Sequence, residues 1–324
     1  MQPEAFSMEG RFFKGNLHTH SNKSDGILSP SEVCKRYENA GYDFISLTDH
    51  LVGRYDYPIV DTKEFRNQNF TTLIGAEVHS GSMLNGELWH LVAVGLPLDF
   101  KPPKTPDFSA LPGMEMANDL AKRCIDTGAF LSIAHPQWSG LVLEDALSID
   151  NFHAVECYNH GSAMQERGDG FTLLDTLLDR DRRCNITAAD DAHFKKRDFF
   201  RGWVMVKALE NSPEALLDSL KAGNYYSSQG PEIHDLRYEN NKILVRSSPI
   251  ERLVLCGKAT TSQYIECQNN EFNEITLVRC RNSPWIRVVV IDQFGKSAPF
   301  KKVYKHFGLT TENISKKIKN LIKN

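Results

Sequence analysis

The chain has 324 residues and a mass of 36.7 kDa, enough for one large domain and one small one. Its hydrophobic fraction of 41% and charged fraction of 24% are those of an ordinary globular protein. The net charge of -3 and the isoelectric point near 6.4 exclude a strong overall attraction to nucleic acid or to an anionic membrane.

Cysteine usage and the first residues indicate the cellular compartment. The seven cysteines are an odd number and include no Cys-x-x-Cys pair, which predicts reduced, mostly buried thiols rather than a disulfide framework. Residues 1–10 contain no apolar run, so we expect neither a signal peptide nor a membrane span there. The chain is therefore predicted to be cytoplasmic, with no membrane partner.

Short apolar runs alternate with helical patterns through the first two-thirds of the chain. Five runs predict strands that are buried on both faces, as parallel strands are: residues 44–47, 71–74, 91–94, 130–133 and 185–187. Four helices are predicted: residues 29–41, 114–127, 170–179 and 212–223. The first begins with a capping box, in which Ser29 is the cap, Pro30 takes the first helical position and Glu32 completes the box.

The pattern changes after Gly230-Pro231. Residues 232–303 contain four apolar runs separated by turn residues, which predicts a small antiparallel β unit. These runs are residues 243–246, 253–255, 274–278 and 286–291, and Ser-Ser-Pro is among the turns between them. Residues 311–323 predict an amphipathic helix. The expected organisation is a barrel over residues 1–228, a β domain over 229–303 and a helix or tail over 304–324.

Histidines and carboxylates recur at the ends of the predicted strands. His18 and His20 lie two residues apart, so on a strand their side chains point to the same side. Neutral imidazoles and carboxylates are the ligands of Zn, Mn and Fe(II), and the mixture suits a cluster of ions. The candidate ligands are His18, His20, Asp25, His50, Glu77, His90, His135, Asp191 and His193.

The distribution of these candidates also decides between two architectures. Alternating strands and helices predict an open doubly wound sheet or a closed barrel. Because the candidates follow many successive strands, and only a closed barrel brings so many strand ends around one point, we expect an α/β barrel. Glu77, at the end of an apolar run, would need a cation or strong donors to offset its desolvation, and a place between two metal ions would satisfy that need.

Six motifs over residues 13–193 resemble, in the same order, those of the PHP (polymerase and histidinol phosphatase) superfamily. They are Asn16–Ser21 with Ser24-Asp25-Gly26 and Ser29-Pro30, Thr48-Asp49-His50, Gly75-Ala76-Glu77, Ala134-His135-Pro136, Glu156–Asn159 and Asp190–His193. The resemblance implies a distorted seven-stranded (β/α) barrel with two or three divalent ions, Zn, Mn or Fe. It also implies a metal-dependent phosphoesterase that acts on a small-molecule phosphate ester. No nucleic-acid substrate is expected, because the chain lacks polymerase segments and a basic surface signal.

The resemblance further implies how the ligands are shared among three ions. The first ion would be held by His18, His20, Glu77 and Asp191. Glu77 would bridge to the second ion, which His90 and His135 complete. The third would be held by Asp25, His50 and His193. Asp190 competes with Asp191, but the family's Asp-x-His spacing selects Asp191. Catalytic roles are expected for Glu77, Asp191 and His193, with Asp191 accepting a proton from the attacking water.

Several other side chains are expected near the site. His79 competes with His90 as a ligand and is expected to support the ligands instead. Asp49 is expected either to support His50 or a neighbour or to be an ordinary surface or turn residue. Glu156, Asn159 and Arg201 are candidates for contact with substrate or for support of the ligands. Tyr158, Trp138 and Trp203 could line a pocket, but a place in the hydrophobic core is favoured.

The C-terminal part offers an alternative activity. Residues 229–233 and 288–295 resemble the β appendage of carbaryl-hydrolase-like PHP proteins, a subgroup that includes hydrolases of carboxylic and carbamic esters. An amide, ester or carbamate hydrolase with the same metal centre is therefore the second hypothesis. A non-catalytic metal-binding scaffold is the third, and the complete ligand set argues against it. The sequence leaves the oligomeric state open.

Overall fold

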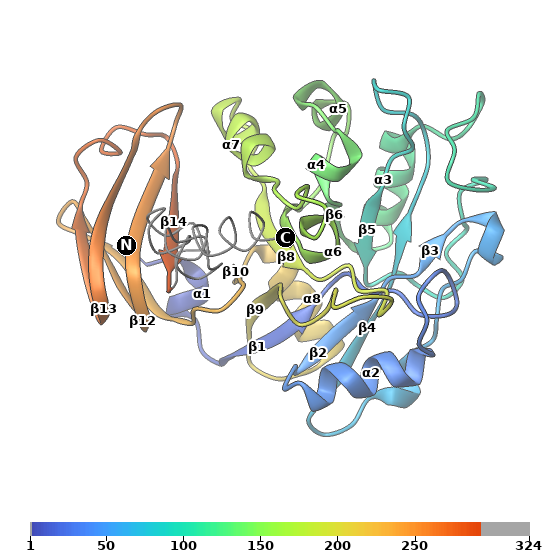
Figure 1. Cartoon of the computed structure of the whole chain (residues 1–324), viewed down its shortest axis with the longest axis horizontal. Helices are drawn as coiled ribbons and strands as arrows, with labels where there is room; N and C mark the ends of the chain where they lie inside the picture. The colour runs from blue at the N-terminus through green and yellow to red at the C-terminus, as the bar shows by residue number, and fades with distance from the viewer. Residues whose placement is uncertain (1, 293–324) are drawn as a thin grey trace, which may run out of the picture. The chain divides into compact units, whose positions relative to one another are not determined.

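The computed structural model of the protein describes residues 2–292 (Figure 1). These residues divide into two compact units, the first of which contains residues 2–230 together with Gly257–Thr261 and Ser283–Trp285. The second contains Pro231–Cys256, Ser262–Asn282 and residues 286–292. The helix predicted over residues 311–323 lies outside the described residues.

The first unit is built on one ten-stranded sheet. Its strands are β1 (Arg11–Asn16), β2 (Phe44–Leu47), β3 (His50–Leu51), β4 (Thr71–Val78), β5 (Leu91–Val94), β6 (Phe130–Ile133), β7 (Ala154–Asn159), β8 (Asn185–Ala189), β9 (Trp203–Ala208) and β10 (Tyr225–Ser228). Their order is β10-β9-β1-β2-β4-β5-β6-β7-β8, with β3 paired to β4. Ser227 Oγ donates to the Ile186 carbonyl at 2.7 Å, which joins β10 to β8. The sheet is therefore a nearly closed barrel, as predicted.

Strand direction differs from the prediction at β5. The pairs β1–β2, β2–β4, β6–β7 and β7–β8 are parallel, but β5 is antiparallel to both β4 and β6. Its four residues are all buried, as expected, yet the prediction of a parallel strand was wrong. Residues 79–90, between β4 and β5, form no helix, and a parallel return would need a long crossover connection, usually helical. The strands β9 and β10 complete the barrel between β1 and β8.

Eight α-helices are described in the first unit. They are α1 (Glu4–Ser7), α2 (Pro30–Asn39), α3 (Ala117–Asp126), α4 (Pro136–Ser139), α5 (Leu143–Leu147), α6 (His160–Ala163), α7 (Phe171–Asp179) and α8 (Pro213–Ala222). The four predicted helices are confirmed as α2, α3, α7 and α8. The capping box of α2 is confirmed too: Ser29 Oγ accepts from Glu32 N–H at 3.3 Å, and Glu32 Oε2 accepts from Ser29 N–H at 2.8 Å.

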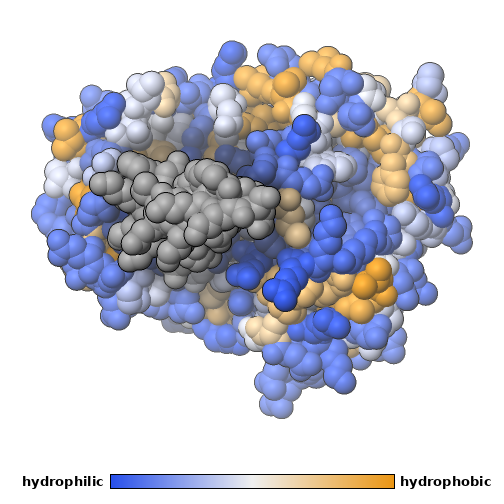
Figure 2. Space-filling view, in the orientation of Figure 1, coloured by the Kyte–Doolittle hydropathy of each residue, from blue (hydrophilic) through white to orange (hydrophobic). Residues whose placement is uncertain are grey.

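The helices bury their apolar faces on the barrel wall. Tyr37 of α2, Leu120 of α3 and Leu220 of α8 are fully buried against strand residues. Much of the outer surface is hydrophilic, as the face in Figure 2 shows. Within residues 2–292, no helix has the length and apolar character needed to cross a bilayer. The buried polar residues include a set of histidines and carboxylates at the strand ends.

The second unit is a four-stranded sheet. Its strands are β11 (Ile233–Glu239), β12 (Lys242–Gly257), β13 (Ser262–Thr276) and β14 (Ile286–Ile291). The pairs β11–β12 and β12–β13 are antiparallel, which confirms the predicted β unit. Asn240 and Asn241 join β11 to β12 with φ values of 49° and 63°, the left-handed conformation that a tight hairpin turn requires.

One boundary in this unit was predicted wrongly. Residues 243–246 and 253–255 were expected to be separate strands with a turn at Ser-Ser-Pro, but both belong to β12. The register against β13 shifts between Arg246 and Ile250, so Pro249 lies at a bulge. A bulge leaves an N–H unpaired, and it therefore accommodates a proline without ending the strand.

Candidate metal centre

The structure brings all nine candidate ligands together at one end of the barrel, although in sequence they are spread from position 18 to position 193. Four groups have ligand atoms within 4.8 Å of one another: His20, Asp25, His50 and His193; His18, Glu77 and His135; His18, His20 and Asp191; and His50, Glu77 and His79. His90 joins them through Nδ1, which lies 2.7 Å from Glu77 Oε1. His79 is thus a tenth member of the cluster. It was expected to support the ligands from behind, but its ring lies among them.

Glu77, near the end of β4, lies at the centre of these groups and is fully buried. Its Oε1 lies 2.7 Å from His90 Nδ1 and 3.2 Å from His135 Nε2. Its Oε2 lies 2.8 Å from His50 Nδ1 and 3.3 Å from His18 Nε2. Burial raises the pKa of Glu77, but the positive charge of the surrounding histidines holds that pKa well below its usual value. Glu77 is therefore a carboxylate with one oxygen facing each side of the centre.

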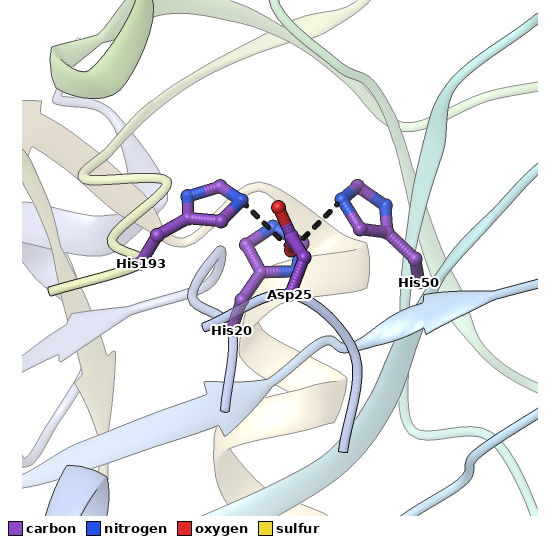
Figure 3. Close-up of side chains that lie close together, drawn as sticks. All are labelled: His20, Asp25, His50 and His193. Atoms are coloured by element: carbon purple, nitrogen blue, oxygen red, sulfur yellow. Dashed lines mark ion pairs between the residues drawn. The ribbon is translucent and has the colours of Figure 1, made fainter. Parts of the chain in front are cut away.

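The Asp25 group, which we define as His20, Asp25, His50 and His193, forms one side of the centre (Figure 3). Asp25 Oδ1 lies 3.1 Å from His193 Nε2 and 3.4 Å from His50 Nε2. The ring of His20 stacks on both, with centroid distances of 4.2 Å to His193 and 4.3 Å to His50. Lys195 Nζ lies 3.0 Å from the second oxygen of Asp25. One oxygen of Asp25 thus faces imidazoles and the other an ammonium.

His18 and His20 lie beyond the end of β1 rather than within a strand. A bridge between Thr19 and Ala192 keeps the segment extended, and Asp191 N–H donates to the His18 carbonyl at 2.9 Å. Asp191 Oδ1 is 3.0 Å from His20 Nε2 and 3.3 Å from His18 Nε2. The pairing of these two segments brings the first and last parts of the predicted ligand set into contact.

Asp190 points away from the centre, although it precedes Asp191 directly. Its carboxylate accepts from the Tyr37 hydroxyl at 2.8 Å and from the N–H groups of Phe200, Arg201 and Gly202 at 2.8, 2.7 and 2.9 Å. Asp191 has a φ of 53°, and this left-handed turn places consecutive side chains in different environments. Asp190 therefore fastens the segment after β8, and Asp191 is the carboxylate that reaches the histidines.

Glu156 supports two ligands from behind. Its Oε1 lies 2.8 Å from His18 Nδ1, which orients that ring with Nε2 toward Glu77. Its Oε2 accepts from His135 N–H at 2.8 Å and from Asn159 Nδ2 at 3.0 Å. The hydrogen bond from His135 N–H helps to hold His135 at a φ of 24°, a conformation that side-chain-bearing residues rarely adopt. Glu156 and Asn159 were expected either to contact substrate or to support the ligands. In the structure they support the ligands.

Asp49 supports a different part of the site from the one expected. It accepts hydrogen bonds from Ser21 N–H (2.8 Å), Ser21 Oγ (2.7 Å), Ser24 N–H (3.1 Å) and Ser24 Oγ (2.5 Å). His50 Nδ1 instead lies 3.0 Å from His79 Nε2. Asp49 therefore fixes the loop that carries Asp25, rather than the ring of His50.

Replacing Asp49 by alanine is expected to loosen the Asp25 group, because four donors lose their acceptor. At about 1 kcal/mol for each hydrogen bond, the free energy of unfolding should fall by roughly 2–4 kcal/mol. Cation affinity at the Asp25 group should fall about 10–100-fold, as is typical when a partner behind a ligand is lost. Urea denaturation and metal titration measure the two effects. Asp99→Ala, at an exposed position, is the control, and unchanged metal binding in Asp49→Ala would contradict the expectation.

Several atoms of the centre lack hydrogen bonds and fit metal ions. Among residues 2–292, the buried cluster atoms without a hydrogen-bond partner are His18 Nε2, His20 Nδ1, Asp25 Oδ1, Glu77 Oε2 and His79 Nδ1. Some lie at ion-pair distance from one another but without hydrogen-bond geometry. Such atoms are costly when buried, and a divalent cation would use their lone pairs. The clusters are therefore consistent with a multinuclear metal site.

Cation binding at the Asp25 group is expected to strengthen as the pH rises. Burial lowers the pKa of His193, but its close pairing with the Asp25 carboxylate and the charge of Asp191 outweigh burial and raise that pKa to about 9. A cation must displace this proton, so affinity should rise up to about tenfold per pH unit until about pH 9 and then level off. Calorimetric titration with Mn²⁺ at several pH values measures the slope. His193→Asn should flatten it, and a flat profile in the unaltered protein would contradict this expectation.

A pocket of about 780 Å³ opens above the centre and is bordered by Asp25, His50, Glu77, His90, His135, Asp191 and His193. Its wall also includes Arg167, Lys195 and Lys196, whereas Arg201 is not among the lining residues. Arg201 contributes its backbone N–H to Asp190 instead, so the geometry does not support its expected contact with substrate. Trp138, expected in the hydrophobic core, is 38% exposed in the pocket wall.

Several residues of the pocket wall were not indicated by the sequence. Phe108 and Arg167 lie in segments without a periodic pattern, so no motif marked them. Lys195 begins a run of three bases that carries no motif, and its ion pair with Asp25 depends on the turn at Phe194, which has a φ of 59°.

Comparisons with known proteins find similarity only at the level of structure. No protein-family model matches the chain, and no curated protein matches it. A two-domain protein from Bacteroides vulgatus that contains a predicted PHP-like metal-dependent phosphoesterase matches with 18% identity, 88% of each chain covered and a TM-score of 0.48.

Two further solved structures are more distant. An amidohydrolase from Chromobacterium violaceum matches with 16% identity over 55% of this chain and 87% of that one, with a TM-score of 0.39. The lesion-specific endonuclease PfuEndoQ from Pyrococcus furiosus matches with 14% identity over 67% of this chain and 57% of that one, with a TM-score of 0.46. Similarity at this level concerns the fold and carries no information on the reaction.

Proposed function

We propose that this protein is a metal-dependent phosphoesterase that hydrolyses a small-molecule phosphate ester. The observation that carries the proposal is the position of Glu77, a fully buried carboxylate at the floor of an open pocket, with histidines facing both of its oxygens. A carboxylate in this place without a cation would be costly, whereas one that is shared between metal ions is stabilised.

The residues present divide into three ligand sets. One ion would be held by His18, His20, Glu77 and Asp191, a second by Glu77, His90 and His135, and a third by Asp25, His50 and His193. Divalent ions supply, when bound, Lewis acidity toward a phosphoryl oxygen and a lower pKa for water. The protein contributes the fixed arrangement of these ligands, which Glu156 and Asp49 maintain from behind.

Asp191 is suited to accept a proton from the attacking water. Burial raises the pKa of Asp191, but the charge of His18 and the hydrogen bond from His20 hold it well below its usual value, so the group is ionised at neutral pH. Asn159 Nδ2 donates to Oδ2 at 3.2 Å and orients this oxygen. His193 also lines the pocket, where it would act as a ligand of the third ion on the side of the leaving group.

Two basic side chains of the pocket wall favour an anionic ester over a neutral one. Arg167 and Lys196 line the pocket, are exposed, and form no ion pair with any residue between 2 and 292. Guanidinium and ammonium groups bind phosphate oxygens. The apolar part of the wall, which includes Phe108, Trp138 and Met164, keeps a carboxylic or carbamic ester as a second candidate substrate.

Metal analysis and a small substrate panel test the proposal. The purified protein should contain two or three equivalents of Zn, Mn or Fe and hydrolyse p-nitrophenyl phosphate faster than the bis-ester or a naphthyl carbamate. Carbamate hydrolysis without phosphatase activity would replace the proposal by the second candidate. Tightly bound metal without hydrolysis of any ester would overturn both and favour a binding protein.

A further inference from the structure

The wall of the pocket carries two chemically different sets of side chains above the metal-binding floor. The apolar set contains aromatic and sulfur-containing side chains: Met83, Phe108, Trp138 and Met164. Arg167 and Lys196 form the basic set. A ligand that complements both sets must be anionic at one end and apolar at the other.

Trp138 is an exposed indole that is nevertheless held in place. Its ring stands edge-on to His135 at a centroid distance of 5.0 Å and to His90 at 5.7 Å. It belongs to α4, which begins directly after His135, and Ser139 Oγ in the same turn lies 3.1 Å from His135 Nδ1. Asn85 Nδ2 donates to the Ser139 carbonyl at 2.8 Å and fastens this turn to a neighbouring loop. The indole therefore offers a preformed apolar surface beside the ligands.

Phe108 contacts a different pair of histidines of the cluster, His50 and His79. Its ring stands edge-on to His50 at 4.8 Å and to His79 at 5.7 Å. Its loop is tied to the segment after β3, because Gly53 N–H donates to the Thr105 carbonyl at 2.8 Å and Arg54 N–H donates to the Pro106 carbonyl at 2.7 Å. The loop that carries Phe108 is thus held by backbone hydrogen bonds.

The two aromatic rings stand on opposite sides of Glu77. His50, which contacts Phe108, approaches Oε2 of Glu77, whereas His90 and His135, which contact Trp138, approach Oε1. A flat ring above Glu77 would have an aromatic side chain within reach on each side. Edge-to-face and offset contacts of this kind are favourable beyond the burial of apolar area alone.

We propose that the pocket selects the phosphate monoester of an aromatic alcohol, with the ring against Phe108 and Trp138 and the phosphate toward the metal ligands, Arg167 and Lys196. This inference rests on the proposed phosphoesterase function and narrows its substrate class. Hydrolysis forms a P–O bond from the water oxygen and breaks the P–O bond to the phenolic oxygen. A proton of the water is transferred to that phenolic oxygen. The products are a phenol and inorganic phosphate.

Binding of two phosphonates to the metal-loaded protein tests the selection without turnover. Phenylphosphonate is expected to bind about tenfold more tightly than methylphosphonate in calorimetric titrations. Trp138→Ala and Phe108→Ala should each reduce this ratio about three- to fivefold, and Trp138→Phe should keep most of it. Phe272→Ala, at an exposed aromatic in the second unit, is the control and should leave the ratio unchanged.

Charge variants separate the contribution of the basic side chains to binding from that of the aromatic ones. Lys196→Gln and Arg167→Gln should weaken both phosphonates by the same factor and preserve their ratio, because both ligands carry the same anionic group. Equal affinity for the two phosphonates, no binding of either, or an unchanged ratio in both alanine variants would overturn the inference.

Turnover then distinguishes this inference from the proposed function. Equal kcat/KM values for phenyl phosphate and ethyl phosphate would overturn the ring selection and leave the phosphoesterase function intact. A clear preference for phenylphosphonate with no hydrolysis of any phosphate ester would support the aromatic site and overturn the phosphoesterase function.

Discussion

Replacing Glu77 by glutamine is expected to remove bound metal and to reduce phosphate ester turnover by more than a hundredfold. The amide keeps the shape of the side chain but has no negative charge and only one acceptor oxygen, whereas both oxygens of Glu77 face histidines. Loss of a group behind a ligand typically costs 10–100-fold, so loss of the shared carboxylate should exceed about a hundredfold. Elemental analysis of the purified variant and its kcat/KM measure the two effects.

Glu64→Gln is the matched control for this substitution, because Glu64 is exposed and is not among the residues that line the pocket. Circular dichroism should show that both variants are folded. A Glu77→Gln protein that retained its full metal content would contradict the central place assigned to this carboxylate, whatever its activity.

Removing the metal ions is expected to lower the midpoint of thermal unfolding by roughly 8–16 °C. A ligand present at a thousandfold excess over its Kd stabilises the folded state by about 4 kcal/mol. In a domain of this size, each kcal/mol shifts the midpoint by about 2–4 °C. The shift should be large here because buried atoms such as His18 Nε2 and Glu77 Oε2 have no hydrogen-bond partner within residues 2–292.

Scanning calorimetry before and after chelation measures this shift, and re-addition of Mn²⁺ or Zn²⁺ should restore it. The Glu77→Gln variant should show little difference between the two conditions, since it is expected to hold little metal. Equal midpoints for the metal-loaded and the chelated protein would contradict a buried metal centre.

Features with a local cause could be predicted from the sequence. The start of α2 was predictable because Ser29, Pro30 and Glu32 satisfy the end of the helix by themselves. The left-handed turn at Asn240 and Asn241 follows from the side chains of these two residues in the same way. The barrel was predictable for a different reason, because so many candidate ligands follow successive strands.

Features that depend on distant parts of the chain could not be predicted. The direction of β5 was hidden, because a strand buried on both faces has the same composition in either direction. The donors to Asp49 were hidden as well, since they depend on the fold of the loop after His20. The Asp-x-His spacing selected Asp191 over Asp190, but the donors to Asp190 were hidden, because the N–H groups of residues 200–202 reach it only through the fold of the following loop.

The reversal of β5 has a consequence for the order in which the chain folds. Because β5 runs back along β4, His90 at its start meets Glu77 after only thirteen positions. Closing a short loop costs less chain entropy than closing a long one, so this pair can form early. Asp191 lies about 170 positions from His18 in sequence, so their contact is expected to form later. A nascent chain that has emerged only as far as α4 would thus already possess Glu77, His90 and His135, the residues assigned to the second ion.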